Sequence, residues 1–191
     1  MKANGKTDVW NKGQTIGPKP PLTQKQINAI RGKLKSGGNL RDLVLFNLAL
    51  ESSLGATDLV QLQLKDIARK GEILSCVSLA SKRTDQAVQF EISPASRALI
   101  EEWVVEKSLK PASYLFASRI NDSPHISARQ YSRIVADWIS LIGLDPKDYS
   151  AQSLRRSKPM MMFIKTKNLN AAMAQLGHAR MRSTVRFLGI E

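Results

Sequence analysis

The chain has 191 residues, of which 42% are hydrophobic, a combination typical of one globular core with room for a small appendage. Its 29 Lys and Arg residues outnumber 16 Asp and Glu residues, and the net charge of +13 favours a polyanionic partner. No apolar run approaches the ~20 residues of a membrane-spanning helix, and the first residues lack the apolar segment of a signal peptide. These features argue against a membrane partner and predict a cytoplasmic, nucleoid-associated protein.

The first 21 residues, rich in Gly, Pro and Lys, are interpreted as a flexible basic N-terminal arm. A tag remnant or a disordered leader would have the same composition, and both alternatives stay open. The rest of the chain, residues 22–191, is predicted to form one DNA-binding domain. Its first helix begins after Thr23, an N-cap residue with Gln26 placed to complete a capping box, and ends near residues 36–38.

A nearly continuous apolar run over residues 42–54 predicts a helix at the centre of the core. The β-forming residues of segment 66–93 flank turn residues and predict three short antiparallel strands, one of which buries Cys76. Further helices are predicted over residues 57–62, 94–105, 128–142 and 151–188, the last broken near Asn168 and Gly177. The predicted fold class is therefore α+β, mainly α, with one small sheet.

The chain offers few residues for metal or redox chemistry. Two histidines and one cysteine cannot build a standard zinc site, and no cluster has the spacing of metal ligands. We therefore expect neither a metal nor a cofactor.

The C-terminal part of the chain is strongly basic. From residue 151 onward its only acidic residue is the terminal Glu191, whereas a merely solubilising surface mixes both signs. This asymmetry predicts a face that binds nucleic acid, although a solvated basic surface remains the alternative. The basic residues of this part are Arg155, Arg156, Lys158, Lys165, Lys167, Arg180, Arg182 and Arg186.

Three segments together resemble the tyrosine recombinases, also called phage-type integrases. Residues 149–191, with their Leu-Arg-Arg, Leu-Gly-His and STVRFLG motifs, resemble the C-terminal part of that family. Residues 51–67 resemble its first active-site segment, and residues 80–92 resemble its β-hairpin. The resemblance covers residues 23–191 and implies a helical fold like the tyrosine-recombinase catalytic domain, with a small three-stranded antiparallel sheet.

The resemblance also implies a chemistry. In the family, a tyrosine hydroxyl attacks a DNA phosphate and leaves a 3′-phosphotyrosyl link. Two arginines and two histidine-type donors hold the phosphate oxygens as charge builds, and a hairpin lysine protonates the leaving 5′-oxygen. The implied partner is double-stranded DNA.

Some of the family's site residues are present in this chain. Arg155 matches the second arginine, His178 matches the second histidine-type donor, and Lys82 matches the hairpin lysine within a register uncertainty of one residue. His178 at a helix end could instead cap a helix. The residues predicted to contact DNA are Lys82, Arg83, Arg155, Arg156, Lys158, His178, Arg180 and Arg182.

Three positions depart from the family pattern. Gly55 stands where the first arginine is expected, Gln152 where the first histidine is expected, and Phe187 where the nucleophilic tyrosine is expected. These departures predict that the chain is not an enzyme but a DNA-binding pseudo-enzyme, acting as a regulator or accessory factor of a mobile element. Its predicted partners are then DNA and a related active recombinase or other mobile-element proteins.

Three alternatives stay open. A residual strand-transferase could use another nucleophile, such as the nearby Ser183 or Thr184. A Tyr-to-Phe change at position 187 could be an engineered trap. A protein-interaction module could carry its basic face incidentally.

Overall fold

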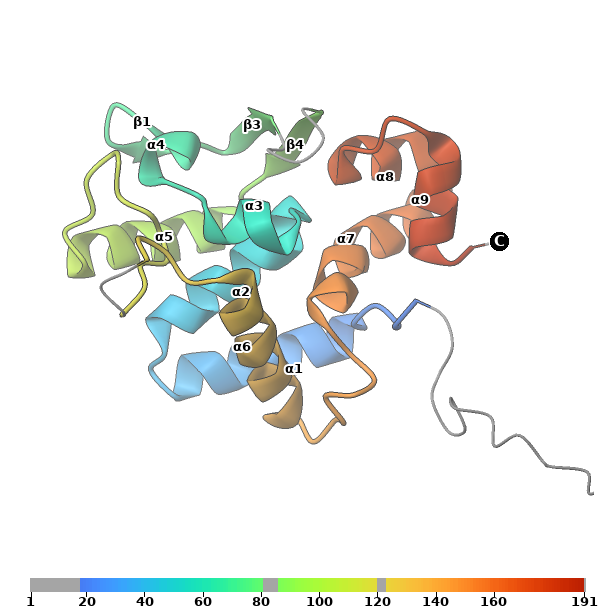
Figure 1. Ribbon diagram of the computed structural model, residues 1–191, viewed down its shortest axis with the longest axis horizontal. Helices are drawn as coiled ribbons and strands as arrows, with labels where there is room; N and C mark the ends of the chain where they lie inside the picture. Colours follow the sequence, from blue (N-terminus) through green and yellow to red (C-terminus); the bar gives the residue numbers. More distant parts are fainter. Residues whose placement is uncertain (1–17, 81–85, 120–122, 191) are drawn as a thin grey trace, which may run out of the picture.

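The computed structural model describes residues 18–80, 86–119 and 123–190. The helices are α1 (Gln24–Ser36), α2 (Leu40–Ser52), α3 (Ala56–Val60), α4 (Leu64–Ile67), α5 (Pro94–Glu106), α6 (Ala128–Ser140), α7 (Ala151–Thr166), α8 (Leu169–Leu176) and α9 (Met181–Leu188). The strands are β1 (Ala68–Arg69), β2 (Glu72–Ile73), β3 (Cys76–Ala80) and β4 (Ala87–Glu91). Figure 1 shows the helices packed around α2, with the short strands gathered along one side.

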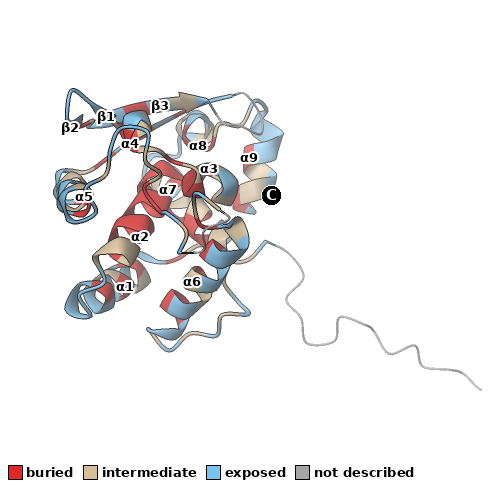
Figure 2. Ribbon diagram, turned by 60° about the vertical axis from the view of Figure 1, so that its left-hand side comes forward, coloured by how far each residue is buried: buried red, intermediate tan, exposed pale blue. Residues whose placement is uncertain are grey.

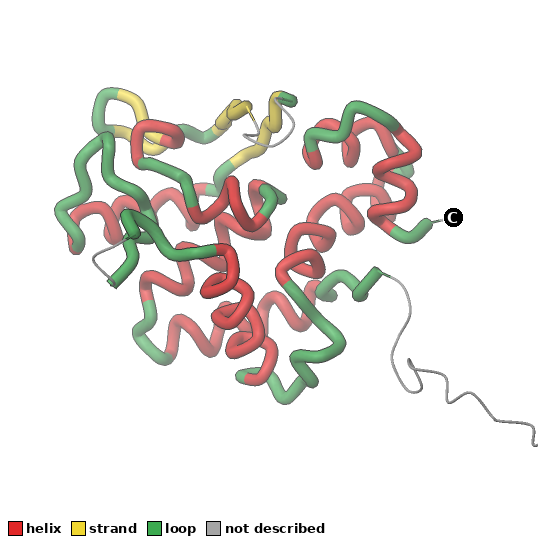
Figure 3. Tube along the Cα trace, in the orientation of Figure 1, coloured by secondary structure: helices red, strands yellow, loops and turns green. Residues whose placement is uncertain are grey.

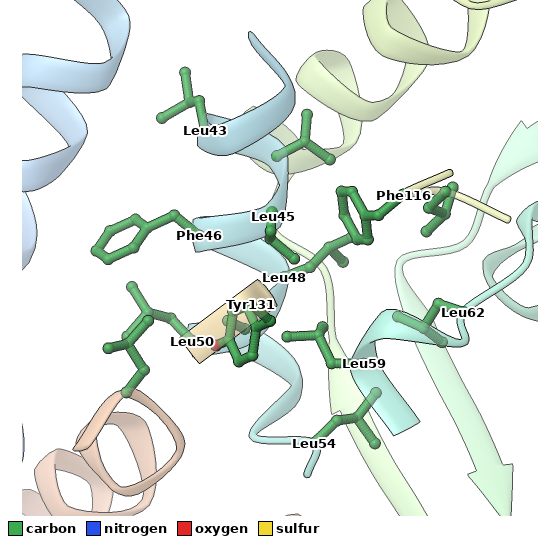
Figure 4. Close-up of a cluster of buried hydrophobic side chains, with 14 of the residues drawn as sticks. Leu43, Leu45, Phe46, Leu48, Leu50, Leu54, Leu59, Leu62, Phe116 and Tyr131 are labelled. Atoms are coloured by element: carbon green, nitrogen blue, oxygen red, sulfur yellow. The ribbon is translucent and has the colours of Figure 1, made fainter. Parts of the chain in front are cut away.

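The apolar helix α2 lies at the centre of the core, as the sequence predicts. Every residue from Leu43 to Ser52 is buried, because α2 packs against α1, α5 and α7. Figure 4 shows Leu45 and Leu48 of this helix on the side of Phe116, whereas the ring of Phe46 projects to the opposite side of the helix. Burial on all sides removes the need for the polar face of a surface helix.

Tryptophan side chains also belong to the core. Trp103 and Trp138 are buried, so neither ring is an exposed stacking platform. The Trp138 indole donates a hydrogen bond to Asp42 at 3.0 Å and meets Phe46 edge-on at 5.3 Å between ring centroids. This bond satisfies the polar end of a ring that is otherwise surrounded by apolar groups.

The prediction of a small antiparallel sheet is right in kind and wrong in detail. Among the described residues, the strands form two separate two-stranded sheets, β1–β2 and β3–β4, instead of one three-stranded sheet. A tight turn with Lys70 and Gly71 at positive φ joins β1 to β2. The chain then bends at Ser75, so β2 ends before it can pair with β3. Figure 3 shows the strands as short yellow segments on one side of the helices.

Cys76 is exposed, which corrects the expectation of a buried thiol. In β3 only Val77 is fully buried, opposite Phe90 of β4, and Cys76 points to the other face. The two-residue period of a strand places neighbours on opposite faces, so an apolar stretch alone does not show which residue faces inward.

The C-terminal helices form a second, smaller core. Ala172, Leu176 and Leu188 are its buried residues, and they lie apart from the main cluster around α2. The predicted breaks are confirmed: Asn168 caps the start of α8, and Gly177 ends it with φ of +64°. Figure 1 shows α8 and α9 beyond α7, and Figure 2 shows α7 with buried residues between them and α2.

Two further sequence expectations concern the N-terminus and the bilayer. Residues 1–17 of the predicted arm lie outside the described residues, so the boundary at residue 21 stays a prediction. The capping box of Thr23 and Gln26 at the start of α1 is confirmed. Within the described part of the chain, no helix combines the length and apolar composition needed to cross a membrane.

Candidate functional site

A pocket of about 190 Å³ brings together four of the residue positions that the sequence singles out. Gly55, Gln152, Arg155 and His178 come from the α2–α3 loop, from α7 and from the turn after α8, yet all of them line it. The full lining consists of Leu54, Gly55, Ala56, Thr57, Asp58, Val88, Gln152, Arg155, Leu176, Gly177 and His178. The described residues also enclose larger hollows, but one of about 730 Å³ between the start of α2, α5 and α6 is lined by none of these four positions.

The Arg155 guanidinium is held by two backbone carbonyls. Its Nε donates to the oxygen of Ser53 at 2.9 Å, and its Nη2 donates to the oxygen of Leu176 at 3.1 Å. These carbonyls belong to the ends of α2 and α8, where helices leave their last carbonyls without internal partners. The third nitrogen, Nη1, borders the pocket near Gly55. The side chain is therefore fixed before any ligand binds.

The His178 ring is oriented by contacts to α9. Its Nδ1 is hydrogen-bonded to Thr184 Oγ1 at 3.0 Å, and Thr184 is fully buried. The backbone N–H of His178 donates to Met173 O, so the backbone of this residue caps α8 while its ring faces the site. The alternative of a merely capping histidine accounts for its backbone only.

Gly177 allows this arrangement for two reasons. Its φ of +64° lies in the left-handed region that residues with a Cβ avoid. In addition, a Cβ at this position would lie 2.6 Å from Val88 Cγ2, because α8 packs directly against β4. Glycine is thus required for the approach that sets His178 beside the pocket.

Phe187 places its ring among the cationic side chains. The ring centroid lies 5.4 Å from Arg155 Cζ, 4.8 Å from Arg156 Cζ and 5.5 Å from the His178 ring. Guanidinium groups at these distances are attracted to the electron-rich face of an aromatic ring. Position 187 is therefore next to the predicted phosphate-binding residues, as the resemblance implied.

The backbone does not explain glycine at position 55. Gly55 has φ of −64° and ψ of 153°, an ordinary extended conformation, and it precedes α3. A Cβ there would meet Arg155 Nη1 at 3.5 Å and Asp58 Oδ2 at 3.7 Å, which are ordinary contact distances. A larger side chain at this position would project beside the guanidinium. Gln152 is exposed on the first turn of α7.

Arg156 is a correction to the predicted DNA contacts. It is only 4% exposed and donates hydrogen bonds to the carbonyl oxygens of Phe187 and Lys19. Burial lowers its pKa. The 100° step of a helix turns Arg156 away from Arg155 and toward α9, so a phosphate contact is not available to it.

Lys158 is half-buried. Its Nζ donates to the backbone carbonyl oxygen of Glu51 at 3.1 Å. Burial lowers the pKa of Lys158, while the carboxylates of Glu51 and Glu91 act in the opposite direction. A lysine held in this way is not placed to contact DNA.

The remaining predicted contacts divide into two groups. Arg180 and Arg182 are exposed around the start of α9. Lys82 and Arg83 lie outside the described residues, so their place in the site stays a prediction. No group of His, Cys, Asp and Glu in residues 18–80, 86–119 and 123–190 could hold a metal ion.

Two roles escaped the sequence prediction. Thr184 was considered only as an alternative nucleophile, yet it is buried and orients His178. Arg156 was assigned to the surface because of its basic neighbours. No motif distinguishes these roles, since both depend on where α9 packs.

Comparison with known proteins shows which family this chain resembles. A family model described as the phage integrase family matches residues 20–189. "Probable integrase/recombinase YoeC" of Bacillus subtilis (strain 168) is 28% identical over 153 residues, which cover 80% of each chain.

The same fold occurs in solved structures. XerA recombinase matches with a TM-score of 0.73 and 15% identity, over 92% of this chain and 60% of that protein. XerH recombinase bound to its difH substrate also matches at 0.73, with 18% identity, over 92% and 52%. A lambda integrase dimer bound to a COC′ core site matches at 0.66, with 14% identity, over 92% and 49%. The chain thus spans about half to 60% of these proteins, and the predicted tyrosine-recombinase type of fold is confirmed.

Proposed function

The chain belongs to the phage integrase family, and from this membership we propose that it binds double-stranded DNA and takes part in DNA recombination. Two solved proteins with this fold hold their sites of action: XerH is bound to its difH substrate, and lambda integrase is bound to a COC′ core site. The observation that carries the proposal is the convergence of Arg155 and His178 on one pocket. A fixed guanidinium beside an imidazole suits one phosphate group.

The prediction that the chain is not an enzyme is contradicted. The family and the relative from Bacillus subtilis are integrases and recombinases, which are enzymes. No described residue shows this chain to be inactive, and the carbonyl bonds of Arg155 keep its guanidinium beside the pocket. The departures from the family pattern therefore bear on how the chain acts, and they do not remove it from this class.

In the proposed complex, Arg155 supplies the principal charge to a DNA phosphate. His178 supplies a ring donor, and Gln152 at the pocket edge can donate from its neutral amide. The exposed Arg180 and Arg182 extend the basic surface from the pocket along α9 and contact neighbouring phosphates. Lys82 and Arg83 of the hairpin are proposed to approach the same strand.

Asp58 opposes an anion at this position. Its carboxylate lines the pocket, 3.7 Å from where a Cβ of residue 55 would lie. A ligand with one phosphate therefore meets a mixed charge, and the affinity must come from several phosphates bound at once. A duplex, which offers several phosphates, is therefore favoured over a free nucleotide.

The residue at position 187 bears on which protein supplies the attacking hydroxyl. Phenylalanine has no hydroxyl, so a phosphotyrosyl link cannot form at this residue. We propose that the chain works in DNA recombination as an accessory or regulatory component of a mobile element's recombinase, in which this chain binds the phosphate and a related subunit supplies the attacking tyrosine. Strand transfer by another nucleophile, such as the exposed Ser183, is the competing possibility.

Two assays on the full chain test these proposals. Fluorescence anisotropy with a labelled duplex, repeated over a range of salt concentrations, should give log K against log salt with a slope of about −4 to −5 if five phosphates are neutralised. A slope near zero would contradict DNA binding. A nicked suicide duplex, resolved on a denaturing gel, should give no covalent band from the chain alone, and a band that Ser183→Ala abolishes would replace the accessory role with strand transfer.

A further inference from the structure

The N-terminal segment of residues 18–22 lies against the C-terminal part of the molecule. Its sequence, Pro-Lys-Pro-Pro-Leu, contains three prolines, which lack an N–H and hold the backbone extended. Lys19 Nζ donates to Tyr149 O at 3.0 Å, and Leu22 N donates to Ser157 Oγ at 2.9 Å. Pro18 reaches the end of α9, since its Cγ lies 3.4 Å from where a Cβ of Gly189 would be.

Arg156 joins this segment to α9. Its Nη1 donates to the carbonyl of Lys19, and its Nε donates to the carbonyl of Phe187. The carbonyl of Phe187 lies in the last turn of α9, where it has no partner within the helix and where a cation favours the helix dipole. One side chain thus holds two segments 168 positions apart in the sequence, from Lys19 to Phe187.

The burial of this cation requires both contacts. In residues 18–80, 86–119 and 123–190, no carboxylate forms a salt bridge with Arg156, although only 4% of the residue is exposed. A buried guanidinium without a counter-ion is costly unless its N–H groups are satisfied. The two carbonyls and the face of the Phe187 ring, 4.8 Å away, provide that compensation.

α9 depends on such a contact because its own core is small. Its buried apolar residue, Leu188, packs with Ala172 and Leu176 of α8 in the smaller cluster, apart from the main core. The ring of Phe187 contacts Arg155 and His178, and both of these residues line the pocket. A shift of α9 therefore moves the ring and, through Thr184, the imidazole of His178.

We propose that Arg156 is a positioning residue: its two hydrogen bonds link segment 18–22 to α9 and thereby fix residue 187 and His178 at the pocket. We call this link through Arg156 the latch. The latch couples the two ends of the described chain, so loosening either end loosens the other. It does not rest on the proposed function, because it can be measured without DNA.

The test uses nuclear magnetic resonance of the full chain, which has two histidines. The His178 ring proton signals sense the Phe187 ring at 5.5 Å, whereas His125 packs on Tyr114 at 4.9 Å and serves as the internal control. Arg156→Met should move the His178 signals and leave those of His125 unchanged. Arg69→Met, which removes an exposed arginine on β1, should move neither.

Hydrogen exchange of the same variants provides the second readout. Arg156→Met should speed exchange of the α9 amides at least tenfold and leave those of α2 unchanged. Arg156→Lys keeps the charge but cannot reach both carbonyls with a planar fork, so its effect should be intermediate. Equal acceleration of α2 and α9, or full rescue by lysine, would overturn the latch.

A variant on the other side of the latch separates coupling from a local effect and also serves if Arg156→Met does not fold. Ser157→Ala removes the acceptor of Leu22 N without touching Arg156 or α9. The latch predicts that α9 exchange and the His178 signals change in the same direction, by a smaller amount. Unchanged α9 and His178 in Ser157→Ala would show that segment 18–22 does not act on the pocket.

Discussion

Replacing Gly177 by alanine should destabilise the molecule through two separable effects. A residue with a Cβ at φ of +64° costs about 1–2 kcal/mol. The new Cβ would also lie 2.6 Å from Val88 Cγ2, and overpacking of this kind costs about 1–3 kcal/mol more. The expected loss of unfolding free energy is therefore about 2–5 kcal/mol.

Gly143 offers a matched control. Its φ of +73° imposes the same backbone cost, but nothing lies within 4 Å of where its Cβ would be. Urea unfolding, followed by the fluorescence of the buried Trp103 and Trp138, should show Gly143→Ala losing only the backbone part. Equal losses in the two variants would refute the close approach of α8 to β4 as the reason for Gly177.

Further predictions concern residue 55 at the pocket, the hydrogen bonds at the start of α5 and the loss of stability at high pH. The Cβ of Gly55→Arg fits at ordinary contact distances. This variant should bind a duplex more strongly and steepen the slope of log K against log salt by about 0.9, whereas Gly55→Ala should change neither quantity. An unchanged slope in Gly55→Arg would place residue 55 away from a phosphate. The carboxylate of Glu51 accepts hydrogen bonds from Ser93 Oγ at 2.7 Å and from Ser96 Oγ at 2.8 Å at the start of α5. Glu51→Ala should therefore lower the unfolding free energy by about 2–4 kcal/mol. A loss under about 1 kcal/mol in urea unfolding would contradict this prediction. Burial raises the pKa of Tyr131, so the stability that this residue contributes is present below pH ~10 and is lost at higher pH, where the tyrosine of the unfolded chain ionises. In Tyr131→Phe the fall of the unfolding free energy above pH ~10 should be shallower by about 1.4 kcal/mol per pH unit. An identical slope in the two proteins would contradict this prediction.

The sequence predicts most of the fold because its local signals agree with the packing. The apolar run of α2, the Thr23 capping box and the glycine at the end of α8 each have one consistent structure. The sheet was predicted less well, because a bend at Ser75 separates β2 from β3 and no residue type marks it strongly. The exposure of Cys76 likewise depends on strand register, which composition does not determine.

The site shows a similar limit. The motifs assign Gly55, Gln152, Arg155 and His178 to one site, and these four residues line one pocket. The neighbouring Arg156 was misplaced, although it differs from Arg155 by a single position. Its burial depends on segment 18–22 and α9, which lie far away in the sequence and meet it only in the folded chain.

Binding of Arg155→Ala to a DNA duplex at low salt tests the central claim most directly. Loss of a charged hydrogen bond to phosphate should weaken binding by about 1.5–3 kcal/mol, which is roughly 10- to 150-fold. Lys33→Ala, which removes an exposed cation from α1, is the control, and circular dichroism verifies that both variants are folded. We expect a much larger loss of affinity for Arg155→Ala than for Lys33→Ala, and equal losses would mean that total charge alone holds the DNA.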